Sequence, residues 1–277
     1  MIAVMSASGW PGCAPHNTHI SNVMFLQWTM KRMSTEAVAD ELESALAQKV
    51  RGTAQFLQGA VLDYGRVVYA TSLGSESLVL TDLIFQHAPQ IDVFTVDTGR
   101  LPEATLELLE RIERHYGRRI RVVYPESQSI QNYVADHGVN GFYRGLAERQ
   151  ACCSIRKLEP FKRAIAGYSA WVTGVRQEQS PSRALAQASE FDARFGMQKL
   201  SPLLLWTRDE VWTYIRARRL PYNPMHDVGY PSIGCAPCTR AVEPGQDSRA
   251  GRWWWESPES RECGLQPRKL PGSISDL

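Results

Sequence analysis

The sequence lacks an excess of charge of either sign. It has 31 lysines and arginines against 29 aspartates and glutamates, which leaves a formal net charge of +2. Proteins that bind duplex nucleic acid usually present a large electropositive face, so nucleic acid is not expected among the partners. Long apolar runs are also missing. None approaches the roughly 18 residues of a membrane-spanning helix, so no membrane partner is expected.

Cysteine is scarce and unevenly placed. The six cysteines of the 277 residues include two tight groups, Cys152–Cys153 and Cys235 with Cys238. A secreted disulfide framework spreads its cysteines along the chain, so this grouping argues against that class. It favours metal or redox use of thiols in a reducing compartment, which we take to be the cytoplasm. A chain of this length can also bury a sizeable core without disulfides.

Acidic residues are absent from 1–33, where no helical or strand period is visible either. The basic residues Lys31 and Arg32 come last, whereas a secretory signal has them first and a mitochondrial presequence has more arginine. We expect residues 1–33 to be a disordered or non-native extension, with Met33 as an alternative start, and we give Cys13 no role. A folded domain is expected over 34–242, and a mobile Pro- and Gly-containing segment over 243–277.

Apolar strands alternate with helices along the folded part. Helical spacing is visible from residue 34 to 50 and again after the first two strands. The predicted strands are 66–73, 91–97, 118–126 and 170–175. Strands that are apolar throughout and alternate with helices predict an α/β fold with an open, mostly parallel twisted sheet and helices on both faces.

Two helices have recognisable ends. In the helix predicted after residue 102, Pro102 suits the first turn and Gly117 can end it, and the expected buried stripe is Leu106, Leu109 and Ile112. Within 206–220, Thr207 and Glu210 have the spacing of a capping box. The polar segment 176–184 is predicted to be a loop, and regular structure is hard to assign from 221 onward.

Two turns at the ends of predicted strands carry groups suited to a nucleotide. The first, TSLGSES (71–77), runs into a helix N-terminus, where backbone N–H groups and the helix dipole can bind a phosphate. It is not a Walker loop, because the GxxxxGK[ST] spacing is missing. The second, Asp97-Thr98-Gly99, would lie beside the first if the two strands are neighbours. An ordinary turn explains each sequence about equally well.

The two cysteine groups supply four thiolates, enough for zinc or an iron–sulfur cluster. Adjacent cysteines seldom bridge each other, because the ring they would close is strained. Zinc usually takes two CxxC-like pairs, whereas a cluster presents separate irons to neighbouring cysteines. A redox disulfide at Cys235 and Cys238, or purely structural cysteines, are poorer alternatives, because a thioredoxin-like CxxC opens a helix just after a strand.

The tail gathers arginines, tryptophans and a further cysteine. Arg249 and Arg252 precede Trp253–Trp255, and Cys263 directly follows the charged pair Arg261 and Glu262. Guanidinium groups suit planar oxyanions, and a thiol in polar surroundings is typical of an exposed, reactive cysteine. A solvated charge run, a docked tryptophan patch and an unused cysteine are the plain alternatives.

Taken in order, these motifs resemble the APS/PAPS reductase family, and within it the bacterial assimilatory adenylylsulfate (APS) reductases. The segments are CC followed by IRK, WVTGVR, PYNPMHDVGYPSIGCAPCTRAV, RAGRWWWE and ECGL, and the likeness covers about 50–266. It implies an adenine-nucleotide α-hydrolase-like fold. It also implies thiol-dependent reduction of APS to sulfite and AMP through an enzyme S-sulfocysteine, in sulfate assimilation and cysteine biosynthesis.

The resemblance implies a role for individual residues. Cys263 would be the nucleophile, and a [4Fe–4S] cluster would be held by Cys152, Cys153, Cys235 and Cys238. The implied substrate-binding residues are Ser72, Gly74, Glu76, Asp97, Thr98, Gly99, Lys157, Arg176, Arg249 and Arg252. Among these, Lys157 would lie between cluster and substrate, and the two tail arginines would contact the phosphosulfate. Thioredoxin or glutaredoxin, as a separate protein, would be the reductant.

Two positions depart from the family pattern. Gln266 stands where a histidine is usual, which predicts a slower enzyme, and Ser77 stands where relatives often have an acidic residue. A PAPS reductase is the first alternative and would need a basic pocket for the 3′-phosphate. A tRNA-thiolating enzyme should have the paired glycines of a PP-loop, and a non-enzymatic iron–sulfur or zinc module would not require Cys263. The number of chains stays open, and a homo-oligomer is compatible with the sequence.

Overall fold

The computed structural model describes residues 43–180, 183–261 and 264–265. The chain separates into two compact units, 1–48 and 49–277, and the second is described below. The extension 1–33, most of the helix predicted over 34–50, Cys263 and Gln266 all lie outside the described residues or outside this unit. The boundary predicted between 242 and 243 stays a prediction.

The larger unit is built around a six-stranded sheet in the order β3-β2-β1-β4-β6-β5. The strands are β1 (Val67–Ala70), β2 (Asp92–Val96), β3 (Arg121–Val123), β4 (Ala170–Val172), β5 (Ser189–Asp192) and β6 (Met197–Leu200). All neighbouring pairs are parallel except β5 with β6. The α/β prediction and the four predicted strands are confirmed, although each strand is shorter than expected.

The hairpin of β5 and β6 was not predicted from the sequence. Its strands are short and carry charged residues, so they show no apolar run. Glu190 lies directly opposite Lys199, and the two side chains form an ion pair at 3.1 Å. Cross-strand charge pairs stabilise a sheet without producing an apolar run. Gly196, at φ +65°, takes the left-handed conformation that the turn between the strands requires.

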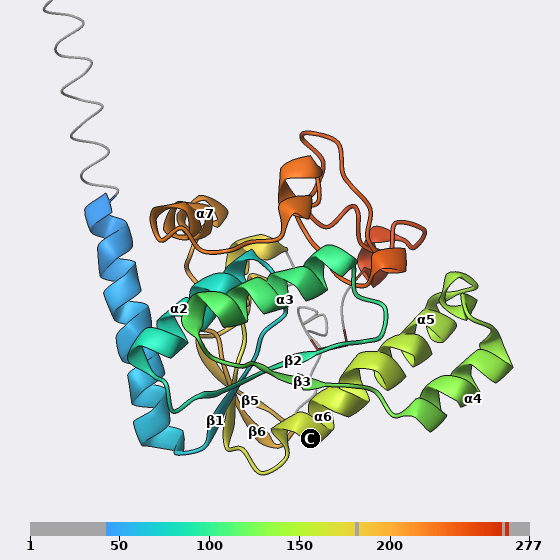
Figure 1. Cartoon of the computed structure of the whole chain (residues 1–277), viewed down its shortest axis with the longest axis horizontal. Helices are drawn as coiled ribbons and strands as arrows, with labels where there is room; N and C mark the ends of the chain where they lie inside the picture. Colours follow the sequence, from blue (N-terminus) through green and yellow to red (C-terminus); the bar gives the residue numbers. More distant parts are fainter. Residues whose placement is uncertain (1–42, 181–182, 262–263, 266–277) are drawn as a thin grey trace, which may run out of the picture. The chain divides into compact units, whose positions relative to one another are not determined.

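Helices cover both faces of the sheet (Figure 1). After a helix that includes 49–64, they are α2 (Ser75–His87), α3 (Glu103–Tyr116), α4 (Ser127–His137), α5 (Leu146–Cys153), a π-helical turn (Ser154–Leu158), α6 (Glu159–Ile165) and α7 (Arg208–Ala217). Phe161 of α6 packs with Phe94 and Trp171 on one face, while Tyr69 of β1 donates to the Ser77 carbonyl at the start of α2. None of the described helices is long and apolar enough to cross a membrane.

Helix α3 buries Ile112 as predicted, but the rest of its buried stripe differs from the prediction. Thr105, Leu108 and Ile112 are buried, whereas Leu106 is 43 % exposed. The polar Thr105 turns inward because its hydroxyl accepts a hydrogen bond from the buried Asn223 amide at 3.0 Å. The predicted end at Gly117 is confirmed, with φ at +61°.

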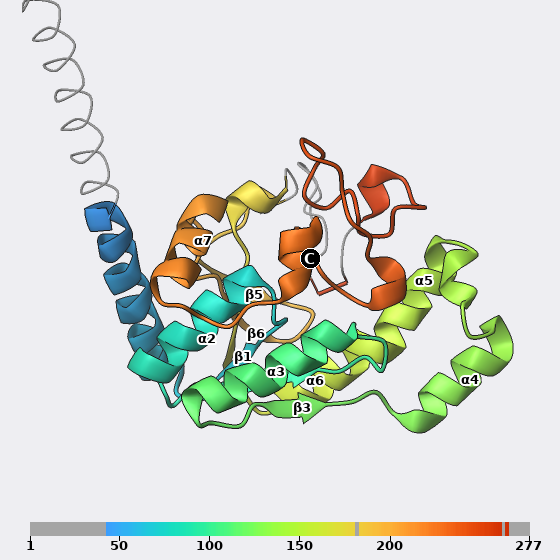
Figure 2. The same cartoon turned by 45° about the horizontal axis from the view of Figure 1, so that its top comes forward.

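Helix α7 begins with the predicted capping box. The Thr207 hydroxyl accepts from the Glu210 backbone N–H at 3.2 Å, and the Glu210 carboxylate accepts from the Thr207 N–H at 2.7 Å. Lys49 also donates to Glu210 at 2.7 Å, which ties the start of α7 to the first helix of the unit. Elsewhere, α5, the π-helical turn and α6 follow one another as one rod (Figure 2).

Candidate functional site

A cavity of about 310 Å³ lies at the carboxyl ends of the parallel strands, where open α/β sheets bind ligands. Its wall takes residues from the ends of β1, β2 and β4, from the rod of α5 and the π-helical turn, and from 226–253. The predicted substrate-binding residues that line it are Ser72, Gly74, Glu76, Thr98, Lys157, Arg176, Arg249 and Arg252. Asp97 and Gly99 are not among the lining residues.

The turn after β1 is held by hydroxyl groups. The Ser77 hydroxyl accepts from the Ser72 N–H at 3.1 Å and lies 2.9 Å from the Ser72 hydroxyl, and Leu73 adopts a positive φ of 58°. Gly74 is the N-cap of α2 and has no side chain to fill the turn. Through these two contacts Ser77 closes the turn.

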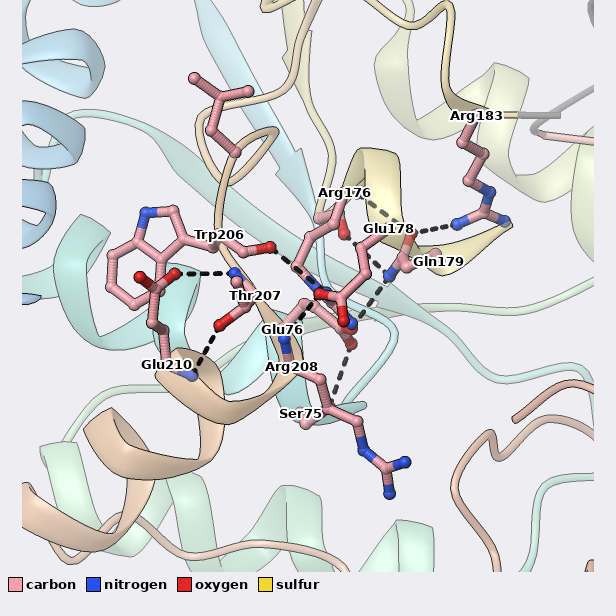
Figure 3. A network of polar contacts seen from close by, with 12 residues as sticks. Ser75, Glu76, Arg176, Glu178, Gln179, Arg183, Trp206, Thr207, Arg208 and Glu210 are labelled. Carbon is pink, nitrogen blue, oxygen red and sulfur yellow. Dashed lines mark hydrogen bonds and ion pairs between the residues drawn. The ribbon is translucent and has the colours of Figure 1, made fainter. Parts of the chain in front are cut away.

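Glu76 and Arg176 form the centre of a buried polar network (Figure 3). One carboxylate oxygen of Glu76 accepts from Arg176 Nε and from the Gln179 amide, each at 2.9 Å. Burial alone would raise the pKa of Glu76, but Arg176 and the Gln179 hydrogen bond outweigh it, so the pKa is lowered. Arg176 also pairs with Glu178 at 2.8 Å, so two carboxylates balance its charge, and the pairing with Glu76 links the loop after β4 to the turn after β1.

The turn after β2 joins the nucleotide side of the cavity to the cysteines. The Asp97 carboxylate accepts from the Gly99 N–H at 2.8 Å and so stabilises the turn, although Asp97 does not line the cavity. The Thr98 hydroxyl lies 3.2 Å from Cys235 Sγ, and its carbonyl accepts from Arg156 Nη1 at 2.8 Å. Arg156, which the sequence analysis did not single out, thus ties this turn to the helix that carries the paired cysteines.

The four clustered cysteines meet at one wall of the cavity. Two of them end α5 and two flank the short 3-10 helix Ala236–Cys238, and none of the four forms a disulfide. Burial, followed by repulsion from Cys235, raises the pKa of Cys238 to about 12. Among the described residues, no three Cys, His, Asp or Glu side chains are placed to share one metal ion. The thiols are gathered, but not around a single ion.

The rest of the lining is strongly basic. Among the described lining residues, nine are arginines or lysines and one, Glu76, is acidic, although the whole chain has a net charge of only +2. Two of the nine, Arg149 and Arg176, are paired with carboxylates. Arg252 lies over the Trp253 ring at 4.6 Å and against Gly234, where an added Cβ would be 2.1 Å from Nη2. Arg249 donates to the Arg261 carbonyl at 3.0 Å. This concentration of positive charge suits a polyanionic ligand.

His226 is a further lining residue that the sequence analysis missed. Its Nδ1 lies 2.8 Å from the Tyr230 carbonyl, which can only accept, so Nδ1 carries the proton. Burial lowers the pKa of His226, which keeps the ring neutral near pH 7. Its Nε2 is buried and has no hydrogen-bond partner among the described residues. The neutral ring therefore leaves Nε2 as a buried acceptor beside the cavity.

Arg149 anchors the tail to the cysteine helix. Its side chain is 2 % exposed, and its Nε and Nη2 donate to the two carboxylate oxygens of Glu256, each at 2.8 Å. Nη2 also donates to the Ser260 carbonyl at 2.9 Å, and the guanidinium lies 4.7 Å from the Trp253 ring centre. Periodicity could not reveal this pairing, because its partners are 107 residues apart.

Comparisons with known proteins place these features in one family. Residues 66–241 match the family model of the phosphoadenosine phosphosulfate reductase domain. The chain is 58% identical over 204 residues to adenosine 5'-phosphosulfate reductase of Allochromatium vinosum, covering 74% of this chain and 80% of the relative. It is 46% identical over 233 residues to the Burkholderia cepacia protein of the same name, covering 84% and 93%.

Solved structures share the fold. Phosphoadenylyl-sulfate (PAPS) reductase from Candida auris, in a phosphate complex, superposes with a TM-score of 0.59 at 26% identity, covering 69% of this chain and 90% of that one. FMN adenylyltransferase of Candida glabrata superposes with a TM-score of 0.52 at 14% identity, covering 82% and 80%, which shows a common fold alone. The expected α/β fold with an open, mostly parallel sheet is confirmed.

Proposed function

Because the chain belongs to the phosphoadenosine phosphosulfate reductase domain family, we propose that it is an adenylylsulfate reductase, which converts APS to sulfite and AMP in sulfate assimilation. The observation that carries the proposal is the cavity. It brings nine basic side chains and four thiols to one space at the edge of the sheet where nucleotides bind. We assign the reaction to the cytoplasm, where thiols stay reduced.

The basic lining accounts for substrate recognition. APS carries a phosphate and a sulfate joined in an anhydride, and guanidinium groups bind such oxyanions in a planar, bidentate way. Lys157, Arg249 and Arg252 are the residues we assign to the phosphosulfate. The turn Ser72–Ser77, at the N-terminus of α2, would bind the nucleotide through its N–H groups.

Sulfur transfer would begin at Cys263, which lies outside the described residues. Its thiolate attacks the sulfur of APS, an S–S bond forms, the bond from sulfur to the bridging oxygen breaks, and AMP leaves. A dithiol of thioredoxin or glutaredoxin then attacks Cys263 Sγ and releases sulfite. Its second thiol resolves the mixed disulfide, so the dithiol supplies both electrons. An unperturbed thiol is only a few per cent ionised at pH 7, so nearby cations would favour both steps.

The four clustered cysteines fit a [4Fe–4S] cluster. All four line one wall, and Cys152, Cys235 and Cys238 pack with Phe142 and Trp253, yet no described trio is placed to share a single ion. That arrangement suits a group whose corners are separate irons better than a mononuclear zinc site. When bound, the cluster would supply a fixed charged centre at this wall, while the electrons come from the dithiol.

Serine in place of Cys238 should remove the cluster, because oxygen is a poorer ligand for these irons than a thiolate. Iron and acid-labile sulfide per chain should fall sharply in Cys238→Ser after anaerobic purification. Cys13→Ser is the matched control and should retain both in full. Full iron and sulfide in Cys238→Ser would rule out the assigned ligand set.

The proposed reaction can be tested without any reductant. Wild type incubated with APS should gain about 80 Da, one SO₃ group, and Cys263→Ser should gain nothing. Repeating the incubation with PAPS distinguishes the main alternative, a PAPS reductase. If wild type binds AMP and holds its cluster but gains no mass with either nucleotide, the assigned reaction is wrong and a binding module becomes the better interpretation.

A further inference from the structure

The two described residues that follow Cys263 are docked on the sheet domain. Leu265 packs against the core cluster that contains Phe161 and Trp171, and it also lines the cavity. Gly264 lies so close to the π-helical turn that an added Cβ would be 3.0 Å from Leu158 Cδ1. The chain next to the assigned nucleophile therefore has a defined place at the cavity.

Arg194, in the turn between β5 and β6, binds both of these residues. Its Nη1 donates to the Gly264 carbonyl at 2.8 Å, and its Nη2 donates to the Leu265 carbonyl at 3.2 Å. Asp192 fixes the guanidinium from the other side, accepting from Nε at 2.9 Å and from Nη2 at 2.7 Å. The Asp192 side chain is 6 % exposed and that of Arg194 is 36 % exposed, so the carboxylate that holds the guanidinium is buried.

The turn itself does not need the Arg194 side chain. Its backbone is closed by the N–H groups of Phe195 and Gly196, which donate to the Asp192 carbonyl at 3.1 and 2.9 Å. Gly196 supplies the left-handed conformation. The guanidinium instead binds the carbonyl oxygens of Gly264 and Leu265, about 70 residues further along the chain.

We propose that Arg194 is a positioning residue for sulfur transfer, which holds the chain that follows Cys263 against the cavity. This inference rests on the proposed function, because it matters only if Cys263 is the nucleophile. Arg194 does not itself line the cavity, so its replacement removes no side chain from the proposed nucleotide site. Holding a nucleophile near its target contributes a large part of the rate enhancement of many enzymes.

The test compares wild type with Arg194→Ala and Arg194→Lys, and uses Arg114→Ala as the matched control. Arg114 pairs with Glu110 on the surface of α3, where both side chains are 71 % exposed. In single turnover with APS, formation of the S-sulfo adduct should slow about 10- to 100-fold in Arg194→Ala, as expected for a misplaced nucleophile. Lysine cannot reach two carbonyls and Asp192 together, so Arg194→Lys should lie between.

Two further readouts separate positioning from a general structural role. The affinity for AMP should stay within about twofold of wild type, because no lining residue is changed. Alkylation of Cys263 by iodoacetamide, followed on its own peptide, should be faster in Arg194→Ala and unchanged in Arg114→Ala. A parallel loss of AMP affinity, or wild-type adduct and alkylation rates in Arg194→Ala, would overturn the proposal.

The alkylation readout keeps this inference separate from the proposed function. If wild type forms no adduct, the assigned reaction fails, and the alkylation rates alone decide whether Arg194 holds the tail. Asp192→Asn offers a second route, because an amide keeps one acceptor but loses the charge that fixes the guanidinium. Its adduct rate should fall less than that of Arg194→Ala, and an equal or greater loss would point to damage of the hairpin instead.

Discussion

Replacing Arg149 with methionine is expected to lower the free energy of unfolding by about 3–5 kcal/mol, because it leaves a buried carboxylate without its partner. The Glu256 side chain is 6 % exposed, and Arg149 donates to both of its carboxylate oxygens at 2.8 Å. Methionine fills much of the same volume, so the loss reports the stranded charge rather than a cavity.

Urea unfolding followed by tryptophan fluorescence measures this effect, since Trp253 lies over Arg149. Arg114→Ala breaks an exposed pair and should change stability by less than about 0.5 kcal/mol. The double variant Arg149→Met with Glu256→Leu should recover a large part of the loss, because no unpaired charge remains. A loss below 1 kcal/mol in the single variant would mean that Glu256 reaches water in solution.

Gly234→Ala is expected to weaken APS binding about 10- to 100-fold while leaving the fold intact, equivalent to the loss of one or two charge-assisted hydrogen bonds. An added Cβ would lie 2.1 Å from Arg252 Nη2 and 2.5 Å from Cζ. Those atoms are the far end of a flexible side chain, so the methyl group displaces the guanidinium instead of the backbone. Arg252 is one of the residues we assign to the phosphosulfate.

Equilibrium binding of APS to a Cys263→Ser background measures the effect without turnover. Gly52→Ala is the control, because nothing lies within 4 Å of its added Cβ and alanine favours the helix there. Gly251→Ala gives the contrast, since its Cβ would meet the Arg240 carbonyl at 2.2 Å and should cost stability. Unchanged affinity in Gly234→Ala would remove Arg252 from the binding site.

Features that depend on a few neighbouring residues could be predicted from the sequence. The capping box of Thr207 and Glu210 and the end of α3 at Gly117 are local, and both are confirmed. The strand–helix alternation, and with it the cavity at the carboxyl edge, follows from periodicity and from the geometry of parallel sheets. The grouping of the four cysteines that line the cavity was predicted from their spacing and from the family resemblance.

Features set by distant partners could not be predicted in this way. Thr105 turns inward because the Asn223 amide donates a hydrogen bond to its hydroxyl. The β5–β6 hairpin is stabilised by Glu190 and Lys199, whose opposite positions are known only from the structure. Arg149 and its partner Glu256 are 107 residues apart, and Arg194 and the Gly264 carbonyl are 70 residues apart. A single sequence gives no sign of which charged residue will be buried against which.

At the π-helical turn Ser154–Leu158, the number of residues matters as well as their identity. Cys152 and Cys153 before this turn and Lys157 within it all face the cavity, while Phe161 beyond it is held by the sheet. A π turn accommodates an extra residue relative to regular α-helical winding. Deleting one residue within 154–158 would therefore restore regular α-helical winding and leave α5 and α6 close to their present phase. The change would fall on the side chains within the turn, Lys157 among them, so the number of residues in this turn decides how they face the cavity.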